Sequence, residues 1–174
     1  MFMSDIIVYW GDAKIKLSWT KSISLPPLNK ITSIHSFCFY NDQLLLVNLN
    51  ERGWDFHGGH LEENETPEEC CRREAWEEGY IEGNCTLLGY ITVSHEENPL
   101  WNETSPYPKI GFQAIYNMEI ELLHPFEGKF ESAERMLIDP DRTSIWYKGW
   151  NSLYEEILED SLASRQLRAV PPDI

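Results

Sequence analysis

Three glutamates, Glu74, Glu77 and Glu78, have the side chains and the spacing that point most directly to chemistry. Residues three and four positions apart are neighbours on a helix, so a helix here would bring the three carboxylates onto one side. Like charges at this spacing destabilise a helix by roughly 0.2–0.5 kcal/mol per pair, a cost that a divalent cation would offset. The three side chains are therefore candidate metal ligands. The alternative is a solvated acidic face on which Arg73 pairs with Glu69 or Glu77.

The sequence specifies where this helix begins. Thr66 followed three residues later by Glu69 forms a capping box, and Pro67 falls at the first helical position. Just before the helix, the consecutive glycines Gly58 and Gly59 allow a tight backbone turn that exposes main-chain amides and carbonyls. We therefore expect a glycine turn followed by an acidic helix, with a main-chain oxygen available to a metal ion.

The segment from Gly58 to Ile81 resembles the Nudix box, which runs G, five residues, E, seven residues, R-E-U-x-E-E-x-G-U, with U an aliphatic residue. The positions that match are Gly59, Glu65, Arg73, Glu74, Ala75, Glu77, Glu78 and Ile81. The glycine near the end differs, because Gly79 comes one residue early and Tyr80 stands in its usual place. If the helix ends at Gly79, Glu78 lies in its last turn. The family's W-x-F-P-G-G approach is also altered, with His57 at the proline position.

The resemblance implies an α/β fold, an α/β/α sandwich with a mixed β-sheet, and metal-dependent hydrolysis of a nucleoside diphosphate linked to another moiety. Carried over by position, Glu74, Glu77 and Glu78 would be catalytic, metal-facing carboxylates for Mg²⁺ or Mn²⁺, and the Gly58 carbonyl a further ligand. Glu65 and Arg73 would be a supporting ion pair. We expect a nucleoside triphosphate or an oxidised nucleotide as substrate. The alternative is a noncatalytic Nudix-like nucleotide-binding module.

Many family members use a further acidic residue from a later loop as metal ligand or general base. Glu131 and Glu134 are the candidates here, with the loop residues Glu96, Glu97 and Glu103 as alternatives.

The long polar stretch from His95 to Pro108 is a candidate functional loop. Its aromatic side chains Trp101 and Tyr107 could form a platform for a nucleobase, or could pack against the loop itself. His57 and His60 are expected at the rim of the site; a zinc-binding H-x-x-H pair is the less favoured interpretation.

Alternating and continuous apolar runs indicate the remaining elements. Ile6–Trp10 and Lys14–Trp19 flank Gly11 and are expected to form an N-terminal β-hairpin. The almost continuous apolar run Leu44–Leu49 is typical of a strand covered on both faces. The other expected strands are Ile31–Tyr40, Thr86–Ser94, Ile110–Leu122 and Met136–Ile138, and the expected closing helix is Asn151–Leu167.

Length and charge limit the function classes. The 174 residues suit a single domain, with residues 1–29 as a hairpin extension and 169–174 as a frayed tail. A formal net charge of −15 argues against an electrostatic surface for nucleic acid or for an anionic membrane, and the resemblance implies a small-molecule nucleotide or nucleoside diphosphate derivative as partner. No apolar run reaches the length of a membrane span, and no charged start leads into an apolar stretch, so we expect a cytoplasmic protein with reduced cysteines. The hairpin could also support a homodimer.

Overall fold

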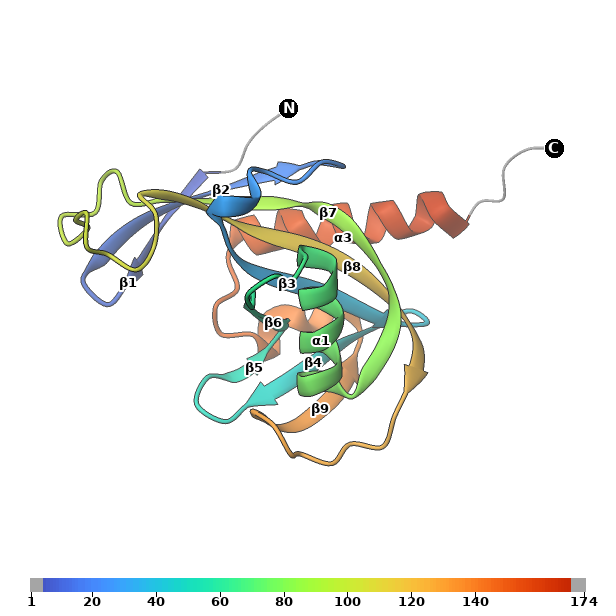
Figure 1. The fold of residues 1–174 in the computed structure, drawn as a ribbon. Coiled ribbons are helices and arrows are strands. Elements are labelled where there is room, and N and C mark those ends of the chain that lie inside the picture. Colours follow the sequence, from blue (N-terminus) through green and yellow to red (C-terminus); the bar gives the residue numbers. More distant parts are fainter. Residues whose placement is uncertain (1–4, 170–174) are drawn as a thin grey trace.

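The structure is a computed structural model that describes residues 5–169 (Figure 1). The frayed tail predicted for residues 169–174 lies outside this range except for Ala169, the last residue of a helix. No helix among the described residues has both the length and the apolar character needed to cross a bilayer.

Within residues 5–169, nine strands form one sheet, and the predicted strands are confirmed with ends shifted by a few residues. The strands are β1 (Asp5–Trp10), β2 (Ala13–Lys21), β3 (Ile31–Tyr40), β4 (Gln43–Leu49), β5 (Gly53–Asp55), β6 (His57–His60), β7 (Ile81–Ser94), β8 (Ile110–Leu123) and β9 (Ser132–Ile138). Their order is β1-β2-β7-β8-β3-β4-β5, with β6 paired to β3 and β9 paired to β4. The β3–β8 pair is parallel and its neighbours are antiparallel, so the sheet is mixed.

In the part of the chain that the structure describes, two long helices cover the two faces of the sheet. They are α1 (Pro67–Gly79) and α3 (Ser152–Ala169), and three shorter segments complete the helical elements: η1 (Leu28–Lys30), η2 (Pro140–Arg142) and α2 (Thr143–Trp146). In Figure 1, α1 lies in front of the sheet and α3 behind it. The α/β/α sandwich with a mixed sheet is therefore confirmed.

β4 shows why its sequence reads as a continuous apolar run. Leu44 and Leu46 belong to the core beneath α3, whereas Leu45 between them belongs to the core beneath α1. Successive side chains of a strand point to opposite faces, so a strand between two helical layers needs apolar residues throughout.

Buried polar contacts attach α3 to its face of the sheet. The Asn117 side chain donates to the Ser161 carbonyl at 3.2 Å, and Ser161 Oγ donates to Asn117 Oδ1 at 2.6 Å. Trp19 Nε1 donates to Asp160 Oδ2 at 2.8 Å. These bonds join β8 and β2 to the same helix.

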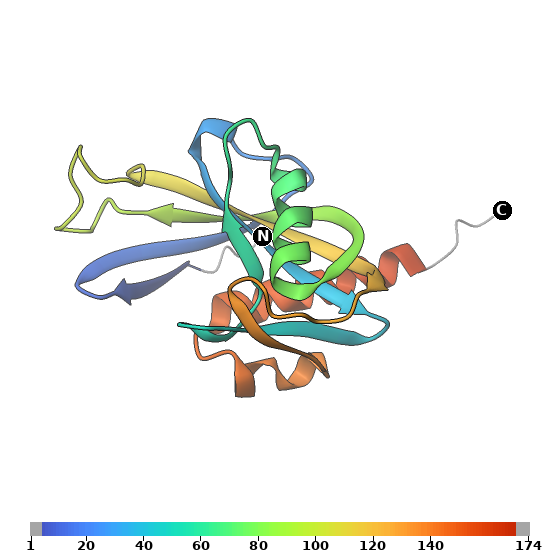
Figure 2. The same cartoon turned by 60° about the horizontal axis from the view of Figure 1, so that its bottom comes forward.

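The N-terminal hairpin is confirmed and extends the main sheet. Gly11 turns the chain with φ of 64°, and β2 pairs with β7 from Lys16 to Lys21. In Figures 1 and 2 the hairpin projects beside the long loop between β7 and β8. Lys14 at its turn forms an ion pair with Glu97 of that loop.

The prediction of a tight turn at Gly58 and Gly59 is wrong. Both residues lie in β6, in register with His35 and Ile34 of β3, and neither has a positive φ. Close approach explains the glycines instead. A Cβ on Gly58 would stand 2.2 Å from His35 Nδ1, and a Cβ on Gly59 would stand 2.0 Å from Glu74 Oε1.

Candidate functional site

The acidic helix α1 forms as the sequence predicts. Thr66 Oγ1 accepts from the Glu69 amide at 3.2 Å, and Glu69 Oε2 accepts from the Thr66 amide at 2.8 Å. The capping box satisfies two main-chain donors at the start of the helix, and Glu68 and Glu69 in the first turn complement its dipole.

The carboxylates of α1 line a cavity of about 870 Å³, which is within the range of small-molecule sites. The walls come from α1, β3, β6, β8 and the segment before β9. Its lining residues are Ser33, His35, Arg52, Gly58, Gly59, His60, Leu61, Glu62, Arg73, Glu74, Glu77, Glu78, Gln113, Phe130 and Glu131. The structure thus brings together the predicted Gly58, Glu74, Glu77, Glu78 and Glu131.

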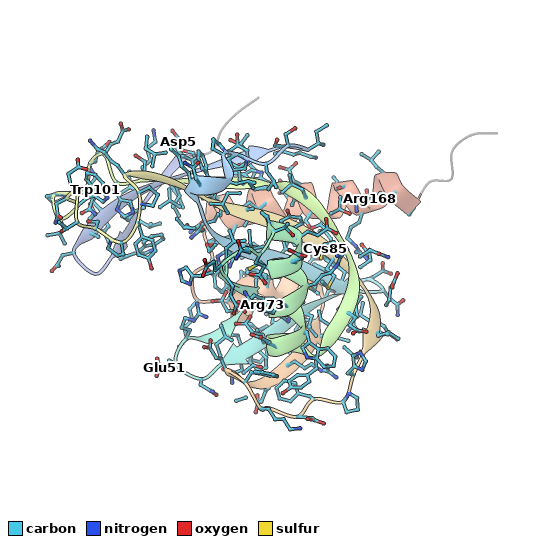
Figure 3. All side chains as sticks on the ribbon, in the orientation of Figure 1. Asp5, Glu51, Arg73, Cys85, Trp101 and Arg168 are labelled. Atoms are coloured by element: carbon cyan, nitrogen blue, oxygen red, sulfur yellow. The ribbon has the colours of Figure 1, made fainter. Side chains whose placement is uncertain are left out.

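Arg73 lies at the centre of the charged network on α1 (Figure 3). Its Nε and Nη2 donate to the two carboxylate oxygens of Glu65 at 2.7 and 3.0 Å, and Nη2 also donates to the His60 carbonyl at 3.1 Å. Nη1 donates to Glu74 at 2.7 Å and to Glu77 at 3.4 Å. The Arg73 contact holds the pKa of the Glu65 carboxyl below its usual range. Arg73 therefore ties α1 to β6 and to the loop before the helix.

Two of the carboxylates are withdrawn from water. Glu78 is 2% exposed, and burial raises the pKa of its carboxyl to about 8, although the Gly58 amide donates to it at 3.1 Å. Burial also raises the pKa of Glu74; Arg73 opposes this shift, and the charges of Glu77 and Glu131 add to it. Negative charge in this cavity is thus poorly compensated by the protein alone.

The chemistry of the donors fits a hard divalent cation. The converging groups present carboxylate and main-chain oxygens, which Mg²⁺ and Mn²⁺ prefer. Within residues 5–169, no three His, Cys, Asp or Glu side chains are already arranged as a metal site. The contacts of Arg73 with Glu74 and Glu77 show what those carboxylates bind instead.

α1 ends at Gly79, so the prediction that Glu78 lies in the last turn is confirmed. The left-handed residue that closes the helix is nevertheless Tyr80, with φ of 54°, and not a glycine. Gly79 serves another purpose, because a Cβ there would stand 2.2 Å from His57 Nε2.

The prediction that His57 lies at the rim is wrong. Its side chain is fully buried, and burial lowers the pKa of the imidazole to about 3. Neither ring nitrogen has a hydrogen-bond partner among the described residues. His60, by contrast, is exposed and lines the cavity as expected.

Hydrogen bonds join the C-terminal end of α1 to the segment that contains Glu131. Ser132 Oγ donates to the Glu78 carbonyl at 2.5 Å, and Arg135 Nη1 donates to the Gly79 carbonyl at 2.7 Å. The Lys129 amide donates to Tyr80 Oη at 2.8 Å. In Figure 2 the orange segment leading into β9 passes the end of α1.

Aromatic contacts strengthen this attachment. The Tyr80 ring lies 5.0 Å from the Phe126 ring, 6.1 Å from Phe130 and 6.1 Å from Trp76 between centroids. We call residues 126–132 the β9 approach. Tyr80 and its partners hold this segment so that Glu131 lines the cavity.

The other candidate carboxylates lie elsewhere. Glu134 is an exposed residue of β9, paired with Asn48 of β4, and is absent from the cavity lining. Glu96, Glu97 and Glu103 in the long loop are also absent from it. Of the predicted later acidic residues, the structure brings only Glu131 to the carboxylates of α1.

A smaller cavity of about 160 Å³ adjoins the first and shares Ser33, His60 and Gln113 with it. Its other lining residues are Trp10, Thr32, Val93, His95, Tyr107, Pro108 and Gly111. Tyr107 also stacks on His60 with ring centroids 6.3 Å apart. Trp101 is outside both linings; its indole donates to the Tyr107 carbonyl at 3.0 Å, and Lys109 lies over its ring.

Sequence reasoning missed several lining residues. Ser33 and His35 alternate along β3 and their side chains are 3.2 Å apart, and the parallel pairing of β3 with β8 places Gln113 beside Ser33. The i, i+2 spacing of Ser33 and His35 indicates that both side chains lie on one face of a strand, and this could have been used to predict them together. The sequence gives no such local sign of the pairing between β3 and β8, because that pairing joins distant segments.

Comparisons with known proteins agree with this architecture. The sequence profile described as the NUDIX domain matches residues 32–158, more than half of the chain. A 44-residue segment is 52% identical to an 8-oxo-dGTP diphosphatase of Proteus vulgaris, covering 25% of this chain and 38% of that protein. The chain therefore matches well under half the length of that relative.

Solved structures share the fold. A pyrophosphohydrolase of Bacillus subtilis superimposes with a TM-score of 0.70 at 21% identity, covering 93% of this chain and 98% of that one. A NUDIX hydrolase of Nitrosomonas europaea superimposes with a TM-score of 0.56 at 19% identity, covering 78% and 90%. The profile match, together with the box on α1, shows that the chain belongs to the Nudix hydrolase family.

Proposed function

We propose that the protein hydrolyses a diphosphate linkage in a nucleoside triphosphate or a related nucleoside diphosphate derivative, with Mg²⁺ or Mn²⁺ as cofactor. The observation that carries the proposal is the convergence of Glu74, Glu77, Glu78 and Glu131 on one cavity. The name of the Proteus vulgaris relative makes an oxidised purine nucleoside triphosphate the first substrate to test.

The charges of the site explain why a metal is part of the proposal. A diphosphate is itself an anion, and it would enter a cavity lined by these four carboxylates in a protein of net charge −15. When bound, a divalent cation neutralises phosphate charge and lowers the pKa of a bound water. Glu74, Glu77 and Glu78 would hold it, with a main-chain oxygen of β6 as a further donor.

The chain's own residues have separable tasks in this scheme. Arg73 orients Glu74 and Glu77 through its fork on Glu65, and Arg52 brings a second positive charge to the cavity wall. Glu131 belongs to the β9 approach and is the candidate for the general base.

The smaller cavity is proposed to receive the base of the nucleotide. Trp10, Val93, Pro108 and Tyr107 give it apolar and aromatic walls, and Gln113 offers both a hydrogen-bond donor and an acceptor. Because Ser33, His60 and Gln113 line both cavities, one ligand can reach from this pocket to the carboxylates. On this proposal the N-terminal hairpin contributes to the site through Trp10.

The test is a panel of nucleoside triphosphates and diphosphate derivatives, oxidised purines included, assayed with Mg²⁺, with Mn²⁺ and with chelator. Glu77→Gln removes one proposed ligand. Glu68→Gln is the matched control, since Glu68 is on the same helix but outside the cavity and pairs with Arg72. We expect metal-dependent turnover by the wild type and Glu68→Gln, and a loss of at least ~10-fold in Glu77→Gln. Equal turnover by all three proteins would overturn the assignment.

The noncatalytic alternative has one observation in its favour. Arg73 bridges Glu74 and Glu77, as a permanent substitute for a metal ion would. That reading predicts nucleotide binding that chelator does not alter, and no product from any member of the panel.

A further inference from the structure

Two thiols outside the cavity face each other across the interface between α1 and β7. Cys71 lies on α1, three residues before Glu74, and Cys85 lies on β7, where it is in register with Met118 of β8. Their Sγ atoms are 3.1 Å apart. That separation is only about 1 Å longer than a disulfide bond.

The environments of the two thiols differ in a way that assigns them different chemistry. Cys71 is 1% exposed, whereas Cys85, labelled in Figure 3, is partly exposed. The contact with Cys71 and the charge of the nearby Arg72 guanidinium lower the pKa of the Cys85 thiol. The same contact raises the pKa of Cys71 well above its usual range. Cys85 is the more exposed of the two sulfurs and the one whose pKa is lowered, so it is the sulfur that a peroxide meets first.

The other two cysteines are placed differently. Cys70 points from α1 toward β6, with Sγ 3.5 Å from the His60 carbonyl, and burial raises its pKa to about 12. Cys38 is fully buried in contact with Ser36 Oγ, and burial raises its pKa further still. Neither has a second sulfur at hydrogen-bond distance among the described residues.

We propose that Cys71 and Cys85 form a reversible oxidation site, at which a hydroperoxide converts the two thiols into a disulfide that links α1 to β7. This site is separate from the carboxylate cavity and does not depend on the proposed hydrolysis.

The reaction proceeds in two balanced steps. The Cys85 thiolate attacks one peroxide oxygen, the O–O bond breaks, and the departing hydroxide takes a proton to leave as water, or as an alcohol from an organic peroxide. The product is a sulfenic acid on Cys85. Cys71 sulfur then attacks Cys85 sulfur, the S–O bond breaks, and the hydroxide leaves with the Cys71 proton as water. The two sulfurs together lose two electrons, which the peroxide gains.

The geometry favours the second step over further oxidation. A sulfenic acid on Cys85 forms next to the resolving Cys71 sulfur, so an intramolecular reaction competes with a second peroxide molecule. The bridge would close a loop of roughly 15 residues, for which restriction of the unfolded chain predicts a rise in melting temperature of about 6–12 °C.

The experiment exposes the reduced full-length chain to hydrogen peroxide, blocks remaining thiols with an alkylating reagent, and measures intact mass and peptide maps without reduction. The expected result is the loss of two hydrogen atoms, a Cys71–Cys85 linked peptide, and reversal by a dithiol reductant. Cys71→Ala and Cys85→Ser should each abolish the linked peptide, while Cys70→Ala, the adjacent thiol on the same helix, should retain it. The melting temperature should rise in oxidised wild type and in oxidised Cys70→Ala.

The proposal is overturned if the wild type gains oxygen at Cys85 without forming the linked peptide, or if its mass does not change. A bridge that includes Cys38 or Cys70 would also overturn it. The wild-type peptide map decides these outcomes by itself, so the test stands even if one variant fails to fold.

Discussion

Tyr80 is the residue at which the chain departs most clearly from the family pattern, and replacing it with the pattern's glycine tests how α1 is held. Relief of the left-handed backbone conformation should stabilise the protein by about 1–2 kcal/mol. Against this, Tyr80 is 4% exposed, and removing a buried aromatic side chain costs about 3–5 kcal/mol. Loss of the bond from the Lys129 amide costs about 1 kcal/mol more. Packing outweighs strain, and we expect Tyr80→Gly to be less stable by about 2–5 kcal/mol.

Urea denaturation at neutral pH measures this difference, with Tyr80→Phe as the matched control. Tyr80→Phe keeps the ring contacts with Phe126 and Phe130 and should lose only about 1 kcal/mol. Because the β9 approach carries Glu131, kcat should fall more in Tyr80→Gly than in Tyr80→Phe under conditions where both are folded. A Tyr80→Gly protein as stable as the wild type, or more stable, would refute the reasoning, since backbone strain would then exceed the packing.

Three further predictions concern the buried His57, the base pocket and the metal-facing carboxylates. For His57, whose pKa is about 3 in the folded chain against 6.5 when exposed, the unfolded state binds the extra proton, so stability falls as pH drops below 6.5. Denaturation curves of His57→Leu should lack this component, and between pH 7 and 5 the wild type should lose about 2 kcal/mol relative to the variant; parallel pH profiles would contradict the assignment. Tyr107→Ala should raise KM for the substrate roughly 10-fold with little change in kcat, whereas Leu100→Ala, an exposed residue of the same loop outside both linings, should change KM less than twofold; equal effects in steady-state kinetics would exclude the proposed base pocket. By calorimetry, Glu78→Gln and Glu77→Gln should each weaken Mg²⁺ binding at least ~10-fold, because Ser132 fixes the last turn of α1; a much smaller loss at Glu78 would mean that this turn is too loose to hold a metal ligand.

The features that sequence reasoning predicted correctly are those encoded locally. The capping box at Thr66 and Glu69 defines the start of α1, and the apolar run in β4 reports a strand with a core on each face. The sequence around Gly11 predicts a hairpin because the turn and both strands are adjacent in sequence. Each signal lies within a few residues of the structure that it specifies.

What could not be predicted depends on contacts between distant segments. Gln113 reaches the site only because β8 pairs in parallel with β3, and no local pattern announces that pairing. Glu131 and Glu134 are both glutamates and are close in sequence, yet only Glu131 lines the cavity, since Glu134 is in β9 and pairs with β4. Consecutive glycines such as Gly58 and Gly59 are typical of a turn. They also occur where a neighbouring side chain leaves no room for a Cβ atom, and the sequence does not show which neighbour that is.

The three departures from the family pattern, at positions 57, 79 and 80, have one common cause, which is the packing of side chains around the end of α1. His57 fills space next to the helix end, and position 79 must then lack a Cβ, since that atom would stand 2.2 Å from the imidazole. The left-handed conformation remains at position 80, where the family has glycine, and Tyr80 adopts it at a cost of about 1–2 kcal/mol.

That cost is offset by contacts that a glycine could not make. Tyr80 packs against Phe126 and Phe130 and accepts from the Lys129 amide, so the same substitution that strains the helix end also holds the β9 approach. Glu131 belongs to the β9 approach, and Glu78 belongs to the last turn of α1, which the β9 approach contacts through Ser132. His57 and Tyr80, where the chain departs from the family pattern, therefore have a structural explanation that leaves every carboxylate of the box in place, and this favours the hydrolase over the noncatalytic module.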